Sequence, residues 1–249
     1  MTSLESPLAK LNRATEQCDA LRRELLTFAN PNIYGITKKQ DADTGYALYS
    51  FENVPTFPDD VGLRLGEMLY NFRCSLDHII WQLVLSERNE PTSRTEFPIF
   101  NNISEYEKVK RGKLKGVSDA VVSIVDSLQP CYNTGNGELS KYLWYLQVLC
   151  NSDKHRHLLF TRRVLGKKIF MNWTGADRIN VEYLAGTVEN GAVFLRVKPA
   201  VDMDISPPIH IFFTNAPTDI RADLGLGPIC GLIRASVRYA FEQLRIYIK

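Results

Sequence analysis

An apolar helical pattern covers residues 65–84. Its apolar residues recur at spacings of three and four, so the segment predicts a helix that is buried against more than one neighbour. Four polar or charged residues interrupt the pattern: Asn71, Arg73, Asp77 and His78. Charged groups inside a buried helix need partners. This segment is therefore the first place to look for a functional site.

The same spacing predicts further helices on both sides of the central one. Asp59 or Asp60 is available as the N-cap of the central helix, and Pro130 ends the helix that precedes it in the chain. The expected helices are Ser3–Phe28, Ser104–Lys110, Asp119–Leu128, Leu139–Cys150 and Pro228–Ile248. Most of the first 156 residues are thus expected to be helical.

Alternation with a period of two predicts strands in two regions. Ile33–Ile36 and Tyr46–Phe51 flank a turn-forming segment and predict a hairpin. From Leu158 onward the period changes to about two, which predicts an antiparallel sheet of about four or five strands. The expected strands are Leu158–Val164, Lys168–Trp173, Arg178–Tyr183, Ala192–Val197 and Ile209–Thr214.

These elements predict an α+β protein that forms a single domain over residues 1–249. Residues 1–156 are expected to be mainly helical, with a β-hairpin near 33–51. Residues 157–215 are expected to form the antiparallel sheet, inserted before the C-terminal helix of residues 216–249. That helix is expected to return to the helical bundle.

Composition narrows the class of protein. Hydrophobic residues make up 45% of the 249 residues and charged residues 23%, which is typical of a globular protein. The net charge of +2 gives no overall basic excess of the kind that marks many nucleic-acid binders. No signal-like N-terminus or long apolar run is visible, so we expect a cytoplasmic location and no membrane association. The five cysteines lack metal-like spacing, and neither a metal nor another cofactor is expected.

Two polar clusters are the candidates for a site. At about 100° per residue, Arg73 and Asp77 stand one turn apart and predict an ion pair. The structural interpretation is that this pair and His78 only hold helices together. A second cluster follows the helix that ends near Cys150, and it contains Asn151, Asp153, Lys154, His155 and Arg156. We expect the two clusters to meet if their helices lie side by side.

The segments that carry these clusters resemble a known group of proteins. Residues 65–78, Phe97–Phe100, Leu128–Tyr132 and Asn151–Arg156 resemble uncharacterised bacterial proteins with an "LRSALDH" helix and an "N-x-DKHR" segment. The Arg73-x4-His78 spacing is similar to the R-x4-6-H motif of HEPN domains, which are helical bundles found in RNases, toxins and phage-defence proteins.

The HEPN resemblance implies a HEPN-like bundle that cleaves RNA without a metal, at a site assembled across a homodimer. It implies that His78 moves protons and that Arg73 stabilises the charge on the phosphate. The position after the arginine is commonly polar in that family and is Cys74 here. The supporting residues in this interpretation are Asn71, Asp77, Asn151, Asp153, His155 and Arg156.

The densest basic run of the chain is a further candidate contact for RNA. It contains Lys108, Lys110, Arg111, Lys113 and Lys115. Such a run either contacts phosphates or forms an ordinary solvated loop. The sequence leaves both interpretations open.

Three functional hypotheses follow. The first is a HEPN-like RNA-cleaving or RNA-binding protein, as in a toxin or a phage-defence effector, whose partners are RNA and a second copy of the chain. The second is a non-catalytic binding or regulatory module whose Arg/Asp/His network is structural. The third is a small-molecule pocket between the sheet and the helices, lined by Trp81, Tyr142 and Trp144. If Arg73 and His78 were both sealed inside the protein, the enzymatic hypothesis would lose its support.

Overall fold

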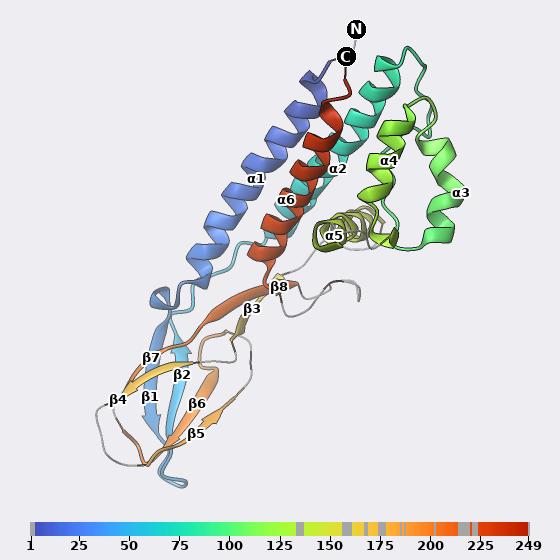
Figure 1. Ribbon diagram of the computed structural model, residues 1–249. Helices are drawn as coiled ribbons and strands as arrows, with labels where there is room; N and C mark the ends of the chain where they lie inside the picture. The colour runs from blue at the N-terminus through green and yellow to red at the C-terminus, as the bar shows by residue number, and fades with distance from the viewer. Residues whose placement is uncertain are drawn as a thin grey trace. The chain divides into compact units, whose positions relative to one another are not determined.

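The computed structural model describes residues 3–132, 137–155, 161–166, 169–173, 178–184, 186, 188–201, 203–213, 220 and 224–248. The fold is mixed α+β with antiparallel strands, as the sequence predicts (Figure 1). The α-helices are α1 (Glu5–Ala29), α2 (Val61–Ser86), α3 (Ile103–Lys113), α4 (Asp119–Ser127), α5 (Gly137–His155) and α6 (Leu226–Arg245), with 3-10 helices η1 (Pro31–Ile33) and η2 (Pro130–Tyr132). The strands are β1 (Gly35–Gln40), β2 (Ala47–Glu52), β3 (Thr161–Leu165), β4 (Phe170–Trp173), β5 (Asn180–Tyr183), β6 (Val193–Lys198), β7 (Met203–Ser206) and β8 (Ile209–Phe213).

The chain divides into two compact units. The helical unit consists of residues 1–22, 60–160 and 215–249, and the β unit of residues 23–59 and 161–214. This division differs from the expected boundary at residue 156, because the hairpin formed by β1 and β2 belongs with the later strands. The strand pairing that joins them connects residues far apart in sequence, which local patterns do not reveal.

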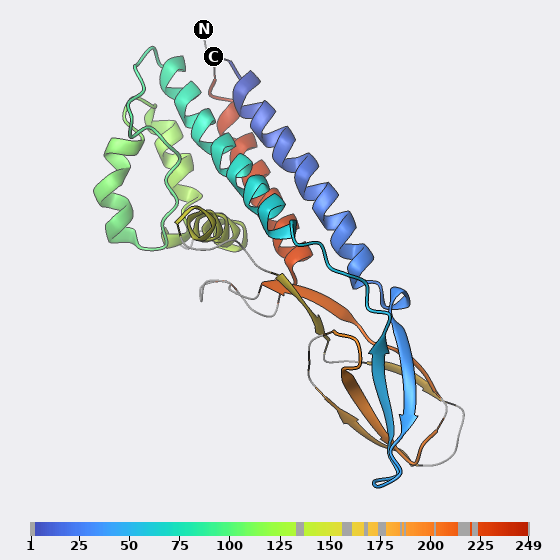
Figure 2. The same ribbon diagram turned by 180° about the vertical axis from the view of Figure 1, so that it is seen from behind.

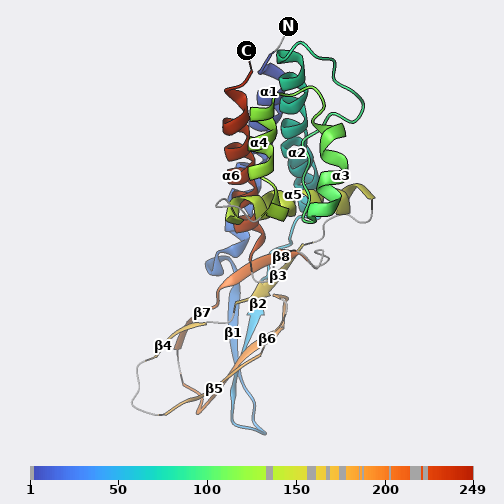
Figure 3. The ribbon, with the colours of Figure 1, turned by 45° about the vertical axis from the view of Figure 1, so that its right-hand side comes forward.

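In the helical unit, α1, α2 and α6 run side by side (Figures 1, 2 and 3). Helix α5 packs against both α2 and α6. The predicted central helix is confirmed as α2, and its residues Leu65, Phe72, Leu76 and Ile79 are almost fully buried. Helix α5 extends five residues beyond its predicted end, so the second polar cluster begins inside the helix and does not follow it.

The segment Phe97–Phe100 forms neither a helix nor a strand, but buried side chains make hydrogen bonds to its backbone. Gln129 is fully buried, and its Nε2 donates to the carbonyl of Pro98 at 2.7 Å. The N–H of Phe100 donates to Oε1 of Gln129 at 3.2 Å. A buried segment outside helices and sheets needs such partners, because an unpaired buried backbone group is costly. Phe97 and Ile99 are buried, so the segment packs against the body of the helical unit.

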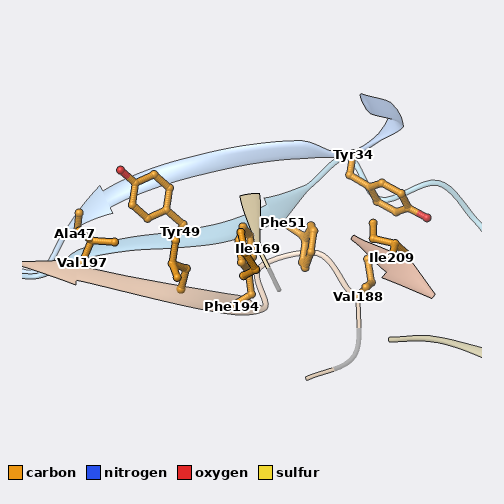
Figure 4. Close-up of a cluster of buried hydrophobic side chains, with 10 residues drawn as sticks. Tyr34, Ala47, Tyr49, Phe51, Ile169, Val188, Phe194, Val197 and Ile209 are labelled. Carbon is orange, nitrogen blue, oxygen red and sulfur yellow. The ribbon is translucent and has the colours of Figure 1, made fainter. Parts of the chain in front are cut away.

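Among the described residues, the β unit contains a four-stranded sheet of order β1-β2-β6-β5 and two two-stranded sheets, β3-β8 and β4-β7. Its core lies on one side of the hairpin, where Tyr34, Tyr49 and Phe51 pack with Ile169 and Phe194 (Figure 4). The expected single sheet from residues 157–215 is therefore wrong, because the described strands of this region are divided among three antiparallel sheets. The hairpin completes the largest sheet, and β7 lies where the sequence indicates only a connection between strands.

The bonds of Gln129 give a test of how the Phe97–Phe100 segment is held. Gln129→Leu keeps a similar volume but removes both partners of the Pro98 and Phe100 backbone groups. We expect the free energy of unfolding to fall by about 2–4 kcal/mol, because each unpaired buried group costs about 1–3 kcal/mol. Urea unfolding followed by circular dichroism measures the change. A loss below about 0.5 kcal/mol, typical of a surface substitution, would contradict this account.

Candidate functional site

Arg73 is buried, with 8% of its surface exposed, and its guanidinium is bound on two sides. Its Nη1 lies 2.7 Å from Oδ1 of Asp77, which confirms the predicted ion pair. Its Nη2 donates to the carbonyl of Phe97 at 2.7 Å. The N–H of Phe97 in turn donates to Oδ1 of Asp77 at 3.0 Å. The pair therefore neutralises itself and holds both backbone groups of Phe97, which is a structural role.

The surroundings of Asp77 affect its protonation. Burial raises the pKa of the Asp77 carboxyl above its usual value of 3.8, while the charge of Arg73 and the N–H of Phe97 act in the opposite direction. Because the folded state holds this proton more tightly than the unfolded state does, its contribution to stability is greatest at low pH. That contribution is lost as pH rises above 3.8 through the raised pKa of the folded protein.

His78 differs from Arg73 because it borders open space. Its Nδ1 lies 2.8 Å from Oγ of Ser6 on α1, and either atom can donate in that hydrogen bond. The ring lines a cavity of about 360 Å³ in the helical unit. The described residues that line the cavity are Ser6, Asp77, His78, Trp81, Gln82 and Thr95. Of the two residues in the Arg73-x4-His78 motif, one is therefore sealed and the other is accessible.

The C-terminal end of α5 lies against α2, so the two polar clusters meet in part. The carboxylate of Asp153 packs so closely on Gly66 that a Cβ there would lie 2.7 Å from its Cγ. Lys154 places its Nζ 5.0 Å from the ring centroid of Tyr70. The charge of Lys154 also reaches Asp77, where it acts to lower the pKa.

The remaining predicted residues of these clusters contribute less. Asn151 is exposed, and Arg156 lies outside the described residues, as does the side chain of His155. Asn71 faces α1, because its Oδ1 accepts from Lys10 at 3.1 Å and its Nδ2 donates to Gln17 at 2.9 Å. These bonds hold α1 on α2 and give Asn71 a structural role.

The basic run is helical and not a loop, since its first four residues lie in α3. Lys110 is paired with Asp126 at 2.7 Å, and Lys113 is paired with Glu96. Burial, followed by the charge of Arg73, lowers the pKa of Lys113. Lys108 and Arg111 are exposed and lie three residues apart on one face of α3, and the exposed Lys115 follows the end of that helix.

Several residues at the cavity are not singled out by the sequence. Ser6, Gln82 and Thr95 reach it from three separate places in the chain, and only tertiary packing brings them together. Trp81, which the small-molecule hypothesis includes, lines the cavity and is 42% exposed. Tyr142 instead is buried and packs edge-on against Tyr145, with ring centroids 5.3 Å apart. The predicted grouping of Trp81 with Tyr142 is thus not found around this cavity.

In comparisons with known proteins, no family model matches the chain, and no curated protein or solved structure is significantly similar to it. The resemblance described above therefore rests on the motifs only. Within the part of the chain that the structure describes, no helix is long and apolar enough to cross a membrane. The described residues also include no group of three or more His, Cys, Asp or Glu side chains that could hold a metal ion.

The Arg73–Asp77 pair generates a prediction about stability. Arg73→Met or Asp77→Leu alone should lower the free energy of unfolding by about 3 kcal/mol, because each leaves one charge unpaired in a poorly solvated place. The double variant Arg73→Met/Asp77→Leu should lose less than the sum of the two single losses. Urea unfolding of all four proteins measures the coupling. Additive losses would mean that the two side chains act independently.

The contact between Gly66 and Asp153 generates a second prediction. Gly66→Ala alone should not stabilise α2, because the new Cβ meets the Asp153 carboxylate. In an Asp153→Ala background the same change should stabilise the protein by about 1 kcal/mol, since alanine favours a helix interior over glycine. The effect of Gly66→Ala on the melting temperature, measured in both backgrounds, tests this. Equal effects would show that Asp153 does not restrict position 66.

Proposed function

We propose that the helical unit binds single-stranded RNA, with one base in the cavity beside His78 and with the adjoining phosphates on the exposed basic face of α3. The observation that carries this proposal is the course of the segment Arg94–Phe97. Thr95 lines the cavity, while Glu96 pairs with Lys113 of α3. Arg94 lies beside α3 at Gly112, where a Cβ would be 3.8 Å from its Cδ. A short stretch of chain thus adjoins both parts of the proposed interface.

The chemistry of the cavity supports a base more than a phosphate. Trp81 offers an exposed ring for stacking. Gln82 keeps its Nε2 available as a donor, because only its Oε1 accepts from the N–H of Ser3. The described lining contains the carboxylate of Asp77 and no lysine or arginine, which disfavours an anion there. Aromatic stacking together with a few polar contacts is how unpaired bases are bound.

The face of α3 supports the second half of the proposal. Lys108, Arg111 and Lys115 are exposed, in contrast to Lys110 and Lys113, whose charges are already paired. Exposed cations on α3 and directly after it attract the phosphate backbone without reading its sequence. We therefore propose that an RNA base stacks in the cavity and that the basic residues of α3 neutralise the charge of the phosphates.

Metal-independent cleavage is a second candidate, and one contact favours it. The hydrogen bond between Ser6 and Nδ1 of His78 orients the ring and leaves its Nε2 available for moving a proton. The expected role of Arg73 as a phosphate clamp is less favoured, because Asp77 and Phe97 already bind its guanidinium. Membership of the HEPN group, a homodimer and a role as a toxin or in phage defence are proposals that depend on this activity.

The binding proposal is tested by fluorescence anisotropy with a labelled, unstructured RNA octamer. Trp81→Ala should weaken binding about fivefold to a hundredfold, because one base–aromatic stack is worth about 1–3 kcal/mol. Arg111→Ala should reduce the slope of log K against log salt by about 0.7, as expected for one lost phosphate contact with a single strand. Arg13→Ala, which removes an exposed arginine on α1, is the matched control. Absence of RNA binding by the wild-type protein at low salt would rule out the proposal.

Cleavage is assayed with the same RNA in EDTA. His78→Ala should abolish it, and Ser6→Ala should reduce it by misorienting the imidazole. An uncleaved RNA that is nevertheless bound would leave RNA binding as the function.

A further inference from the structure

The exposed face of α2 carries a second feature beside the cavity. Tyr70 and Trp81 are 47% and 42% exposed, although most of α2 is buried. At 100° per residue the two rings lie on the same face of the helix, with Asp77 and His78 on the same side. Since each residue rises about 1.5 Å, Tyr70 and Trp81 stand about 16 Å apart along the helix axis. The two rings therefore border one continuous strip of the surface of α2.

Two ammonium groups gather at the ring of Tyr70. Lys10 of α1 places its Nζ 5.6 Å from the ring centroid, and Lys154 of α5 places its Nζ 5.0 Å from it. Lys10 donates one hydrogen bond to Asn71, which leaves other N–H groups of the ammonium for a ligand. Lys10 and Lys154 come from different helices, so tertiary packing brings two positive charges to one exposed ring, where they attract anions.

The surroundings hold Lys154 in place. Asp153 packs on Gly66, which fixes the last turn of α5 against α2. The charge of Lys154 also reaches Asp77, which lines the cavity. Lys154 therefore lies at the Tyr70 end of the strip, where it can contact a phosphate of a bound strand.

We infer that Tyr70, Lys10 and Lys154 form a second nucleotide subsite, in which the tyrosine ring stacks on a base and the two ammonium groups contact its phosphate. This inference rests on the proposed RNA-binding function and specifies its ligand. The strand runs along α2 from Trp81 to Tyr70, so the ligand is an oligonucleotide and not a mononucleotide. Stacking on both rings needs unpaired bases, which makes the ligand single-stranded.

The experiment compares a mononucleotide, a dinucleotide, a tetramer and an octamer of RNA, binding to the full chain. The wild-type affinity should rise with length until both subsites are filled. Tyr70→Ala should weaken octamer binding about fivefold to a hundredfold and remove most of the dependence on length. Tyr70→Phe keeps the ring and should bind the octamer about as well as the wild type.

The lysines are tested through salt dependence. Lys10→Ala and Lys154→Ala should each reduce the slope of log K against log salt by about 0.7. Lys154→Arg, which keeps the charge, should retain the slope. Lys141→Ala is the matched control, because Lys141 also lies over a tyrosine ring, 5.8 Å from the centroid of Tyr145, but that tyrosine is buried. Melting temperatures confirm that each variant is folded.

The outcomes separate the inference from the function on which it rests. If the wild type binds no RNA of any length, the proposed function fails. If the wild type binds the octamer and the Tyr70 and lysine variants bind it equally well with unchanged salt slopes, only the second subsite is ruled out. The subsite is also ruled out if sedimentation shows a wild-type dimer that Tyr70→Ala makes monomeric with unchanged RNA affinity, because the strip would then be an interface between two copies.

Discussion

The ion pair between Arg73 and Asp77 is the constraint on which the arrangement of the helical unit depends. A guanidinium in the middle of a buried helix must be neutralised, and Asp77 does so from one turn away. Nη2 of Arg73 also donates to the carbonyl of Phe97, and Oδ1 of Asp77 also accepts from the N–H of Phe97. Gln129 continues the same pattern along the next residues. Side chains thus replace the backbone hydrogen bonds that an irregular buried segment lacks.

Holding Phe97 in this way also determines what surrounds it. The preceding residues, Thr95 and Glu96, are placed at the cavity and at Lys113 respectively. The sequence offers a structural network and a functional site as alternatives for the same residues. The geometry instead gives some of these residues a structural role and places others at the cavity. Asp77 belongs to both, because it holds Arg73 and also lines the cavity beside His78.

Local periodicity was enough to predict the helices and the Arg73–Asp77 pair, because both depend on residues one turn apart. It could not predict the full composition of the sheet, since β2 pairs with β6 about 150 residues later. Nor could it separate Tyr70 and Trp81 from the core, because an apolar residue in an apolar helix has the same pattern whether or not a neighbour covers it. Ser6 and Thr95 carry no local signal of the cavity, as they reach it only through the packing of α1 and of the loop after α2.

Two lysines give the exposed face of α2 a local positive charge that the net charge of +2 does not indicate. Of the nearby carboxylates, Asp77 is bound by Arg73 and Phe97, and Asp153 is partly buried against Gly66. Glu67 accepts a hydrogen bond from Gln17 on the side of α1. The lysines at Tyr70 have no carboxylate partner within ion-pairing distance among the described residues. A chain with a net charge of +2 can therefore still bring two lysines without an ion-pairing partner to one exposed ring, where they attract anions.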